Sequence, residues 1–578
     1  MSLISRTASL RDLPETCLPS GSDTNTGSSA SLSRIKTWLD ICTSSHPACS
    51  QADSQPPSLP TRVVAVGSRG SSKCYLVSGN KKNGHYATLS HCWGDPNNRP
   101  LSTTDQTLPC RQRGIEDEAL PKTFRHAVKV CREIGIEYIW IDSLCIIQEQ
   151  ETQEDWAKEA PKMGVVYGNS ILNISAAAAA DSTQGLWKER LGLISWPCPI
   201  VVFGQACHLY RYPLLGERMS GEPDNTAYGQ DFLVQRAWVL QEQILSRRSI
   251  MFSTNGLIWR CPTLSTNEKY PLGILHAPDI SHDHHRLLHC IVNGITSLIQ
   301  KEPATDSYSC WYQIVTEYTS RSLTYEEDEL PAIAGIAKRF GMAVNDSYHA
   351  GLWRRDMIIG LLWEAGPAES RGATRSARAP SWSWASIKGG VDYKAVLSYD
   401  AYAGLRRTPL TPLYDILDVS DPVTCENHPF GVTSRASLGL YGVLLAVTPN
   451  EHHISGLALV EKGIPAVGHI NYSWPDTRKF SRLGQVTLVC LPVTVCHGPQ
   501  ALFIPGDGER YKASWKRSLE TGIDEFEAGH TLYCLVLQTI PGNQDTYSRV
   551  GLCSVGRHKT IEISRMALFG ERRSIILV

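Results

Sequence analysis

Side chains that can take part in chemistry gather in three segments that lie far apart in the sequence. They supply hydroxyl, imidazole, thiol and carboxyl groups, from Ser90, His91, Cys92, Asp142, Ser143, Cys145 and Glu242. In the first two segments these groups follow short apolar runs that are typical of buried strands. Because parallel α/β sheets bind ligands beyond the carboxyl ends of their strands, we expect Asp142 and Ser143 to lie at a functional edge. The alternative is a buried Asp142 that caps the next turn.

The elements that would position Asp142 follow from the spacing of the apolar residues. Residues 123–134 place apolar side chains at helical spacing, and Gly135 stands where a helix closes with a left-handed residue. Residues 138–146 then predict a central strand. Since strands are also expected within 86–95, where a short strand runs into a polar exit, and at 171–175, the sequence predicts an alternating α/β fold.

A later helix, expected over residues 236–248, carries Glu242. On a helical wheel, Leu240 and Ile244 belong to an apolar stripe, whereas Trp238 and Glu242 share a face turned away from it. A Glu on such a face is usually just solvated. The large aromatic ring one turn away is what makes Glu242 a candidate functional carboxylate.

The thiols offer a different chemistry. His91 and Cys92 are neighbours on an extended chain and point in opposite directions, so they cannot form a nucleophile and base pair with each other. A nucleophilic Cys92 or Cys145 served by His91 or His126 is an alternative for which the sequence identifies no base partner.

Composition limits the classes of partner. The chain has 578 residues, which favours two or three domains, and a net charge of -1 with a pI near 7.0. Lys and Arg form no continuous block, so we expect no nucleic-acid partner. No apolar window is long enough for a membrane span. Eighteen scattered cysteines in a long chain favour a reducing, cytoplasmic location.

Two clusters have metal-ligand residue types. Cys42, His46 and Cys49 could supply three zinc ligands, but no fourth ligand is evident and the spacing matches no standard finger. The histidines at 282, 284 and 285 lie in a polar stretch that favours a solvated loop. We therefore predict no metal site, and whether the first cluster binds metal stays open.

Three segments resemble the successive motifs of the fungal heterokaryon incompatibility (HET) domain. They are YATLSHCWG at 86–94, LPKTFRHAVKVCREIGIEYIWIDSLCIIQ at 120–148 and RAWVLQE at 236–242, so the core motifs span 86–242. The segment APSWSWAS at 379–386 resembles the region on the C-terminal side of this domain in long fungal proteins. The resemblance implies a role in fungal non-self recognition, as an effector of a programmed cell-death response.

The HET domain is similar to Toll/interleukin-1 receptor (TIR) domains, which implies a TIR/flavodoxin-like parallel sheet with flanking helices. By resemblance to TIR relatives that cleave NAD, Glu242 would be the catalytic carboxylate. Ser90, Asp142 and Ser143 would hold ribose hydroxyls, and Trp93 or Trp238 would stack on a nicotinamide or adenine ring. Because no Gly-x-Gly-x-x-Gly or phosphate loop is present, NAD would be a substrate and no cofactor is expected.

The alternative implied by the same resemblance is a non-catalytic signalling or assembly module, in which Glu242 caps the helix or pairs with Arg236. The expected partners are further copies of the chain, through the HET domain, and an incompatibility partner protein whose identity the sequence does not give.

Four regions follow from these patterns. They are a disordered or variable leader and linker at 1–60, the HET domain at 61–260, a mainly helical region at 261–394 and a β-rich domain at 395–578. In the third region, residues 291–300 and 330–340 predict helices and residues 382–384 predict a packing strand. In the fourth, short β-branched runs alternate with Gly and Pro.

Overall fold

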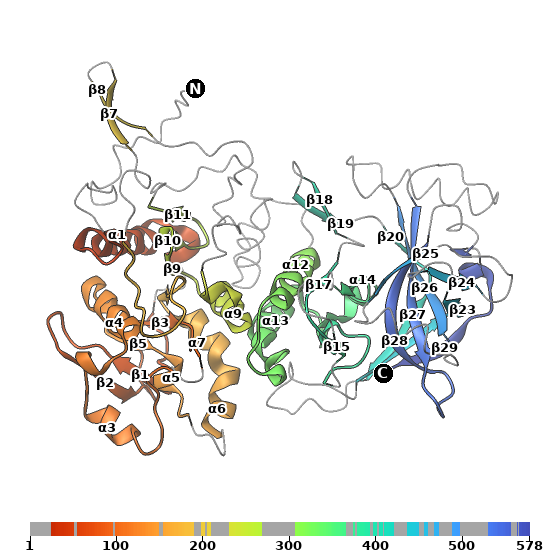
Figure 1. The fold of residues 1–578 in the computed structure, drawn as a ribbon, viewed down its shortest axis with the longest axis horizontal. Helices are drawn as coiled ribbons and strands as arrows, with labels where there is room; N and C mark the ends of the chain where they lie inside the picture. The colour runs from red at the N-terminus through yellow and green to blue at the C-terminus, as the bar shows by residue number, and fades with distance from the viewer. Residues whose placement is uncertain are drawn as a thin grey trace. The chain divides into compact units, whose positions relative to one another are not determined.

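The protein is described from a computed structural model. It describes residues 25–50, 55–95, 99–148, 154–189, 198–202, 205–209, 231–268, 307–365, 374–375, 378–393, 397–400, 404–407, 410–420, 436–449, 456–459, 468–472, 488–497, 530–555, 563–564 and 566–578. The chain forms two compact units, Met1–Gln300 and Lys301–Val578 (Figure 1).

The first unit is built on a nine-stranded sheet with the spatial order β11-β10-β9-β6-β3-β5-β1-β2-β4. The strands are β1 (Arg62–Ala65), β2 (Lys73–Ser78), β3 (Tyr86–Ser90), β4 (Ile115–Glu116), β5 (Tyr138–Trp140), β6 (Leu172–Ser175), β9 (Ser249–Ser253), β10 (Gly256–Arg260) and β11 (Ser265–Asn267). A separate hairpin joins β7 (Cys198–Val202) and β8 (Gln205–Leu209). The mixed α/β architecture expected from the sequence is confirmed.

The four strands β5, β3, β6 and β9 run parallel, and antiparallel strands flank them on both sides. Across the sheet the four parallel strands lie in the order β5, β3, β6, β9, so the one that comes first in the chain, β3, lies second in the sheet. After β3 the chain forms β5 on one side of β3 and then forms β6 and β9 on the other side. The reversal point lies between β3 and β6, which is where open α/β sheets bind ligands.

Helices cover both faces of this sheet. The α-helices of the described part of this unit are α1 (Ser29–Ser45), α2 (Pro47–Ser50), α3 (Leu108–Arg113), α4 (Lys122–Ile134), α5 (Asp142–Cys145), α6 (Glu154–Glu159), α7 (Met163–Asn169) and α9 (Ala237–Leu245). Helix α1 contacts α4 on one face, and α7 contacts α9 on the other (Figure 1). Helix α4 ends as predicted, because Gly135 adopts a left-handed conformation with φ of 83°.

Two expectations need correction. The apolar run 138–146 is a strand only as far as Trp140, because the backbone N–H groups of Leu144 and Cys145 donate to the Ile141 carbonyl and close a helical turn, α5. The segment 1–60, expected as a leader and linker, contains the ordered helices α1 and α2. Helix α1 begins where the Ser28 hydroxyl accepts a hydrogen bond from the Ser31 backbone N–H at 3.1 Å.

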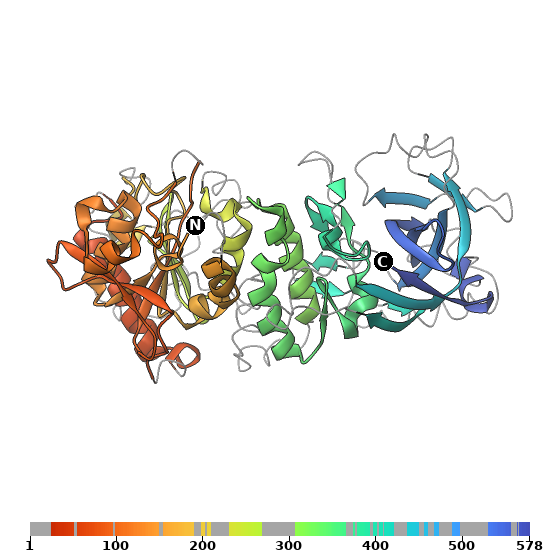
Figure 2. The same cartoon turned by 90° about the horizontal axis from the view of Figure 1, so that it is seen from below.

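The second unit begins with a helical part that has an aromatic core. Helices α12 (Ser307–Ser320) and α13 (Pro331–Val344) lie side by side in Figures 1 and 2, and Trp311 on α12 packs against Phe340 on α13 at 5.4 Å between ring centroids. Helix α13 confirms the helix expected at 330–340, whereas the one expected at 291–300 lies outside the described residues.

The expected strand at 382–384 is wrong. The chain forms a turn there that enters a short 3₁₀ helix, Trp384–Ser386. The Ser383 hydroxyl accepts a hydrogen bond from the Ala385 N–H at 3.0 Å, and the Trp384 indole N–H donates to the Gly351 carbonyl at 2.9 Å. The bond between Ser383 and Ala385 is local and competes with strand pairing.

Short elements connect this helical part to a large sheet. They are α14 (Met357–Gly360), β12 (Tyr348–His349), β13 (Leu352–Trp353), β14 (Glu364–Ala365), β15 (Thr374–Arg375), β16 (Ile387–Lys388), β17 (Val391–Asp392), β18 (Leu397–Asp400) and β19 (Gly404–Arg407). The strands pair as β12 with β13, β14 with β17, β15 with β16 and β18 with β19.

The C-terminal sheet has ten strands, which confirms a β-rich C-terminal region. They are β20 (Leu410–Pro412), β21 (Asp415–Ser420), β22 (Ser437–Gly442), β23 (Leu445–Pro449), β24 (Gly456–Leu459), β25 (Gly468–Tyr472), β26 (Leu488–His497), β27 (His530–Thr539), β28 (Thr546–Val555) and β29 (Arg573–Leu577). Strand β27 pairs with both β26 and β28, so β26, β23, β24, β25, β28 and β27 form a closed ring. The strong curvature of these strands is visible in Figure 2.

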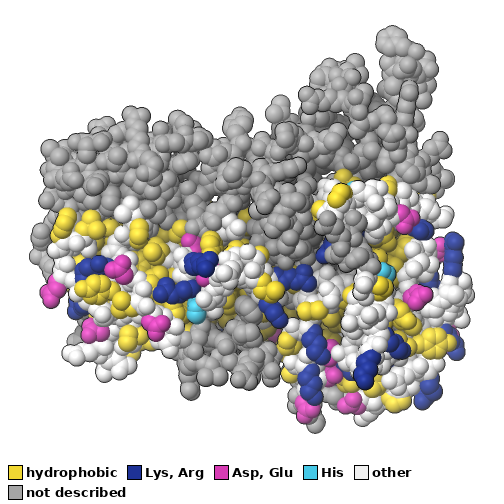
Figure 3. Space-filling model, turned by 180° about the vertical axis from the view of Figure 1, so that it is seen from behind, with side chains coloured by type: hydrophobic (Ala, Val, Ile, Leu, Met, Phe, Trp, Pro, Cys, Tyr) yellow, Lys and Arg dark blue, Asp and Glu magenta, His cyan; other side chains and the backbone are white. Residues whose placement is uncertain are grey.

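The surface of the described residues carries both signs of charge. In Figure 3, Lys and Arg side chains are interspersed with Asp and Glu side chains and with hydrophobic ones on the face shown. Within the described part of the chain, no helix is both long enough and apolar enough to cross a membrane.

Candidate functional site

A chain of buried polar side chains crosses the sheet where β3 meets β6. Thr88 and Ser90 lie two residues apart on one face of β3, and both hydroxyls donate to the Asn173 side-chain carbonyl on β6, at 3.1 and 3.2 Å. The Asn173 amide in turn donates to the Ser175 hydroxyl at 3.3 Å. The predicted site residue Ser90 is therefore held by a partner that the sequence analysis did not single out.

Helix α9 brings Glu242 to this end of β3. Its side chain interacts with the hydroxyls of Ser90 and Tyr167 and with the charges of Asp142 and Arg236. Burial, the largest effect, and the negative charge of Asp142 raise the pKa of Glu242 to about 7, against the lowering effects of Ser90, Arg236 and Tyr167. The late carboxylate and the ends of β3 and β5 thus come together, as the roles implied by the resemblance to TIR relatives require.

The Glu242 carboxyl is incompletely satisfied. The Ser90 hydroxyl donates to Asn173, and the Tyr167 hydroxyl donates to the Leu89 carbonyl at 3.4 Å. Among the described residues, the buried Oε2 atom of Glu242 has no hydrogen-bond partner. A buried polar atom without a partner costs about 1 to 3 kcal/mol, and such atoms mark positions where a ligand or a catalytic step can be expected.

The surroundings of α9 differ from the simple helical wheel. Glu242 is only 7% exposed, so the solvated-face interpretation is wrong. Helix α9 is buried on nearly all sides because it packs against α7 and because its Val239 contacts Cys92, just beyond β3. Trp238, one turn before Glu242, is half-buried.

Asp142 is the second carboxylate of the site. Its Oδ2 atom accepts a hydrogen bond from the Trp93 indole N–H at 2.7 Å, and its Oδ1 atom accepts one from the Ser143 backbone N–H at 2.6 Å. The second contact is made to the next residue along the chain and is not an N-cap, because α5 starts after Ile141 without a side-chain capping bond. The alternative of a buried, capping Asp142 is therefore wrong. Since the Asp142 side chain is 22% exposed, the site reaches the surface there. The Ser143 hydroxyl instead donates to the Leu101 carbonyl at 2.9 Å and is fully buried.

His91 places a buried imidazole next to Asp142. Its Nδ1 atom lies 3.6 Å from Asp142 Oδ1, and its ring meets the Phe124 ring edge-on at 4.9 Å. Burial lowers the pKa of His91, an effect that Asp142 opposes and Arg236 reinforces. The imidazole is therefore neutral and buried at neutral pH.

Arg236 fixes the start of α9. Its guanidinium donates to the His91 carbonyl at 2.8 Å, which ties the helix to the exit of β3. Within the described residues, no ion pair joins Arg236 and Glu242, so the pairing that the non-catalytic interpretation invoked is wrong in that detail.

The thiols are poor nucleophiles in this setting. Burial raises the pKa of Cys92 to about 11 and that of Cys145 to about 12. Cys92 packs against Leu233 and Val239. His126 accepts a hydrogen bond from the Leu186 N–H and stacks on a Trp ring, and burial lowers its pKa to about 4. These contacts disfavour the thiol alternative.

We expect alkylation of the native protein with iodoacetamide to modify Cys110, which is exposed, and to leave Cys92 and Cys145 intact. Because the thiolate is the reactive form, the raised pKa values should slow the two buried thiols by roughly a hundredfold or more. Peptide mass spectrometry after timed quenching measures the rates. Modification of Cys92 as fast as that of Cys110 would return the thiol interpretation to consideration.

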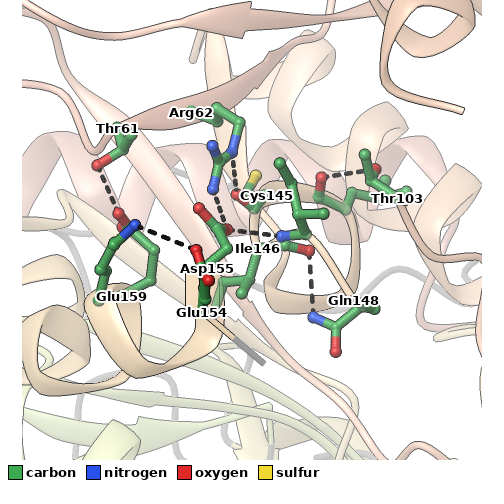
Figure 4. A network of polar contacts seen from close by, with 12 residues as sticks. Thr61, Arg62, Thr103, Cys145, Ile146, Gln148, Glu154, Asp155 and Glu159 are labelled. Atoms are coloured by element: carbon green, nitrogen blue, oxygen red, sulfur yellow. Dashed lines mark hydrogen bonds and ion pairs between the residues drawn. The ribbon is translucent and has the colours of Figure 1, made fainter. Parts of the chain in front are cut away.

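A polar network outside the site holds the segment that comes after Asp142 (Figure 4). The Arg62 guanidinium on β1 donates to the Cys145 carbonyl at 2.7 Å and forms an ion pair with Asp155. Asp155 also accepts a hydrogen bond from the Ile147 N–H at 2.8 Å. Burial raises the pKa of Asp155, but the bonds from Arg62 and Ile147 outweigh it, and the pKa is lowered overall.

Replacing Asp155 with Asn should lower the free energy of unfolding by about 1 to 2 kcal/mol, because it weakens two charge-assisted bonds at a partly exposed position. The loss should be seen as a lower thermal midpoint by differential scanning fluorimetry. Glu154→Gln is the matched control, since Glu154 is exposed on the same helix and pairs only loosely with Lys158 at 3.9 Å. Equal effects of the two substitutions would show that the network does not stabilise this segment.

These features define an α/β domain whose polar and acidic groups converge at the carboxyl ends of parallel strands. Residues 86–242 match the family model described as Heterokaryon incompatibility protein (HET). This part of the chain is therefore a HET domain, as the resemblance of its three motifs implied. Neither a curated protein nor a solved structure matches the chain.

Proposed function

We propose that the HET domain cleaves NAD, with Glu242 as the carboxylate that stabilises the reacting ribose. The single observation that carries the proposal is the buried carboxyl of Glu242, with a pKa near 7 and one oxygen without a partner, beside Ser90 and Asp142. A strongly shifted carboxyl pKa at a ligand-binding edge is a recognised mark of a functional site.

The strand order also supports the proposal. The parallel strands β5, β3, β6 and β9 have the order of the first four strands in flavodoxin-like sheets, in which a nucleotide cofactor binds at the reversal point. Ser90 and Asn173 lie at the corresponding point here. This likeness favours the TIR-like fold that the sequence resemblance implied.

The chemistry suits a single buried carboxylate. The bond between ribose C1′ and the nicotinamide nitrogen breaks, and its electron pair neutralises the pyridinium ring, so the leaving group needs no proton. Positive charge develops on the ribose, as in glycoside hydrolysis, and an ionised Glu242 stabilises it. Water then adds to C1′ and releases a proton, giving ADP-ribose and nicotinamide.

The remaining residues have supporting roles. Asp142, held by Trp93 and partly exposed, would bind a ribose hydroxyl where the site meets solvent. Ser90 would bind a second hydroxyl next to Glu242, while Trp238 would stack on an aromatic ring of the substrate. Ser143 would act only through the backbone N–H that orients Asp142, because its own hydroxyl is committed to Leu101.

In this proposal, NAD cleavage is the effector step of a heterokaryon incompatibility reaction in fungal cytoplasm. Depletion of NAD would produce the cell-death response, and self-association of the domain would activate it. The family description of residues 86–242 supports the incompatibility setting.

The test is incubation of the purified full chain with NAD, alone and after fusion to a domain that forces self-association, followed by chromatography of nicotinamide and ADP-ribose. The proposal expects equimolar release of the two products. If neither the chain alone nor the fusion released nicotinamide, and circular dichroism showed that both were folded, NAD cleavage would be excluded.

The second candidate is a non-catalytic assembly module. It is favoured by the contacts that the motif residues make with one another, since Trp93 bonds to Asp142 and Arg236 bonds to the His91 carbonyl. In that case the motif residues build the fold, and self-association occurs without consumption of NAD.

A further inference from the structure

Four metal-ligand side chains meet between the N-terminal helices α1 and α2 and the turn that follows β10. Cys42, His46, Cys49 and Cys261 place their ligand atoms within 4.8 Å of one another. The first three come from α1, α2 and the link between them, whereas Cys261 follows β10, 215 positions beyond His46. The fourth ligand that local spacing did not reveal is thus supplied by a distant hairpin.

The spacing of the ligand atoms fits a tetrahedral ion. The Nδ1 atom of His46 lies 3.5 Å from the Cys261 sulfur and 3.9 Å from the Cys49 sulfur. Ligands at the usual zinc–sulfur and zinc–nitrogen distances of about 2.3 and 2.0 Å sit about 3.5 to 3.8 Å apart around a tetrahedron.

Donors that do not belong to the ligand set point at the sulfurs. The Arg248 guanidinium lies 3.2 Å from the Cys42 sulfur, the Leu264 backbone N–H lies 3.2 Å from the Cys261 sulfur, and the Thr263 hydroxyl lies 3.5 Å from the Cys49 sulfur. Hydrogen bonds of this kind orient metal ligands and stabilise thiolates.

The burial of the cysteines and the charge beside them also fit a bound metal ion. Cys42 and Cys49 are fully buried, and Cys261 is 8% exposed. Three thiolates, one neutral imidazole and a divalent cation leave one negative charge, which the fully buried Arg248 beside Cys42 offsets. The three cysteines are free thiols, so no disulfide accounts for their meeting.

We propose that Cys42, His46, Cys49 and Cys261 form a structural zinc site of the Cys₃His type. The four protein ligands fill the tetrahedron and leave no open position, which is the arrangement of structural and not catalytic zinc. The site joins helix α1 to the hairpin of β10 and β11. It acts together with the buried ion pair between Arg34 and Glu268, at 2.7 Å, which links the same two parts.

The proposal is tested on the full chain, purified under reducing conditions from cells grown with zinc. Elemental mass spectrometry should find about one zinc per chain and negligible iron. Cys261→Ala should lose at least nine-tenths of that zinc. Cys131→Ala, at a buried cysteine on α4 outside the cluster, is the matched control and should keep it all.

A second pair of variants distinguishes the loss of a zinc ligand from misfolding. His46→Cys should retain zinc, because four thiolates also bind it tetrahedrally, whereas His46→Ala should not. Cobalt exchanged into the wild type should give the visible bands of a tetrahedral thiolate complex. Zinc-free protein, zinc retained by both Cys261→Ala and His46→Ala, or a disulfide within the cluster would each overturn the site, whatever the outcome with NAD.

Discussion

Replacing Glu242 with Gln should reduce nicotinamide release from NAD by roughly a hundred- to a thousandfold, the usual loss when one stabilising group is removed from a developing charge. The amide has the shape of the carboxyl but carries no charge, so it cannot stabilise the cationic ribose. The fold should survive, because burial already disfavours the ionised form of Glu242. Product release is measured by chromatography at saturating NAD, with circular dichroism as the check of folding.

Glu159→Gln is the matched control for this substitution. Glu159 is also 7% exposed and belongs to the same unit, but it bonds to Thr61 and Lys162 outside the site. This control should keep its activity. If Glu242→Gln cleaved NAD at the wild-type rate, the carboxylate would have no catalytic role and the assembly module would become the better proposal.

The second large effect is expected in the pH dependence of stability. Folding raises the pKa of Glu242 from 4.5 to about 7, so the folded state favours the protonated carboxyl. Its contribution to stability is therefore present below about pH 4.5 and is lost as the pH rises through 7. Because Gln cannot ionise, Glu242→Gln should become more stable than wild type over this interval, by roughly 3 kcal/mol at pH 8 relative to pH 4.5.

Urea denaturation of both proteins between pH 4.5 and 8, followed by tryptophan fluorescence, gives this difference directly. Other titrating groups are common to both proteins and cancel in the comparison. A difference that does not change with pH would mean that Glu242 ionises as easily in the folded as in the unfolded chain. This outcome would remove the electrostatic basis of the proposed site without any assay of activity.

Local patterns were sufficient for several of the elements around the candidate site. The exit of β3, the helix α4 with its closing Gly135, and the helix with Glu242 could all be predicted, because each depends on periodicity within a short window. The rule on carboxyl ends of strands placed Ser90 and Asp142 at one edge of the sheet. The position of Glu242 beside them was implied only by the resemblance to TIR relatives.

Contacts between distant segments could not be predicted in the same way. In the sequence, Asn173 is one polar residue in a buried strand and Tyr167 is an ordinary helix residue. Only the folded structure shows that Asn173 bonds to Ser90 and that Tyr167 interacts with Glu242. Cys261 similarly has no local signal, since its ligand partners lie near the other end of the unit. The burial of Glu242 depends on the packing of α7 against α9, and a helical wheel of α9 alone cannot show this contact.

The nine-stranded order has a practical consequence for experiments on isolated fragments. A piece cut at the limits of the family match, 86–242, would lose β1, β2, β9, β10 and β11, five of the nine strands. Its β6 would then present an unpaired row of backbone amides and carbonyls, which promotes aggregation between molecules. Recombinant work on this domain should therefore begin before α1 and extend past β11.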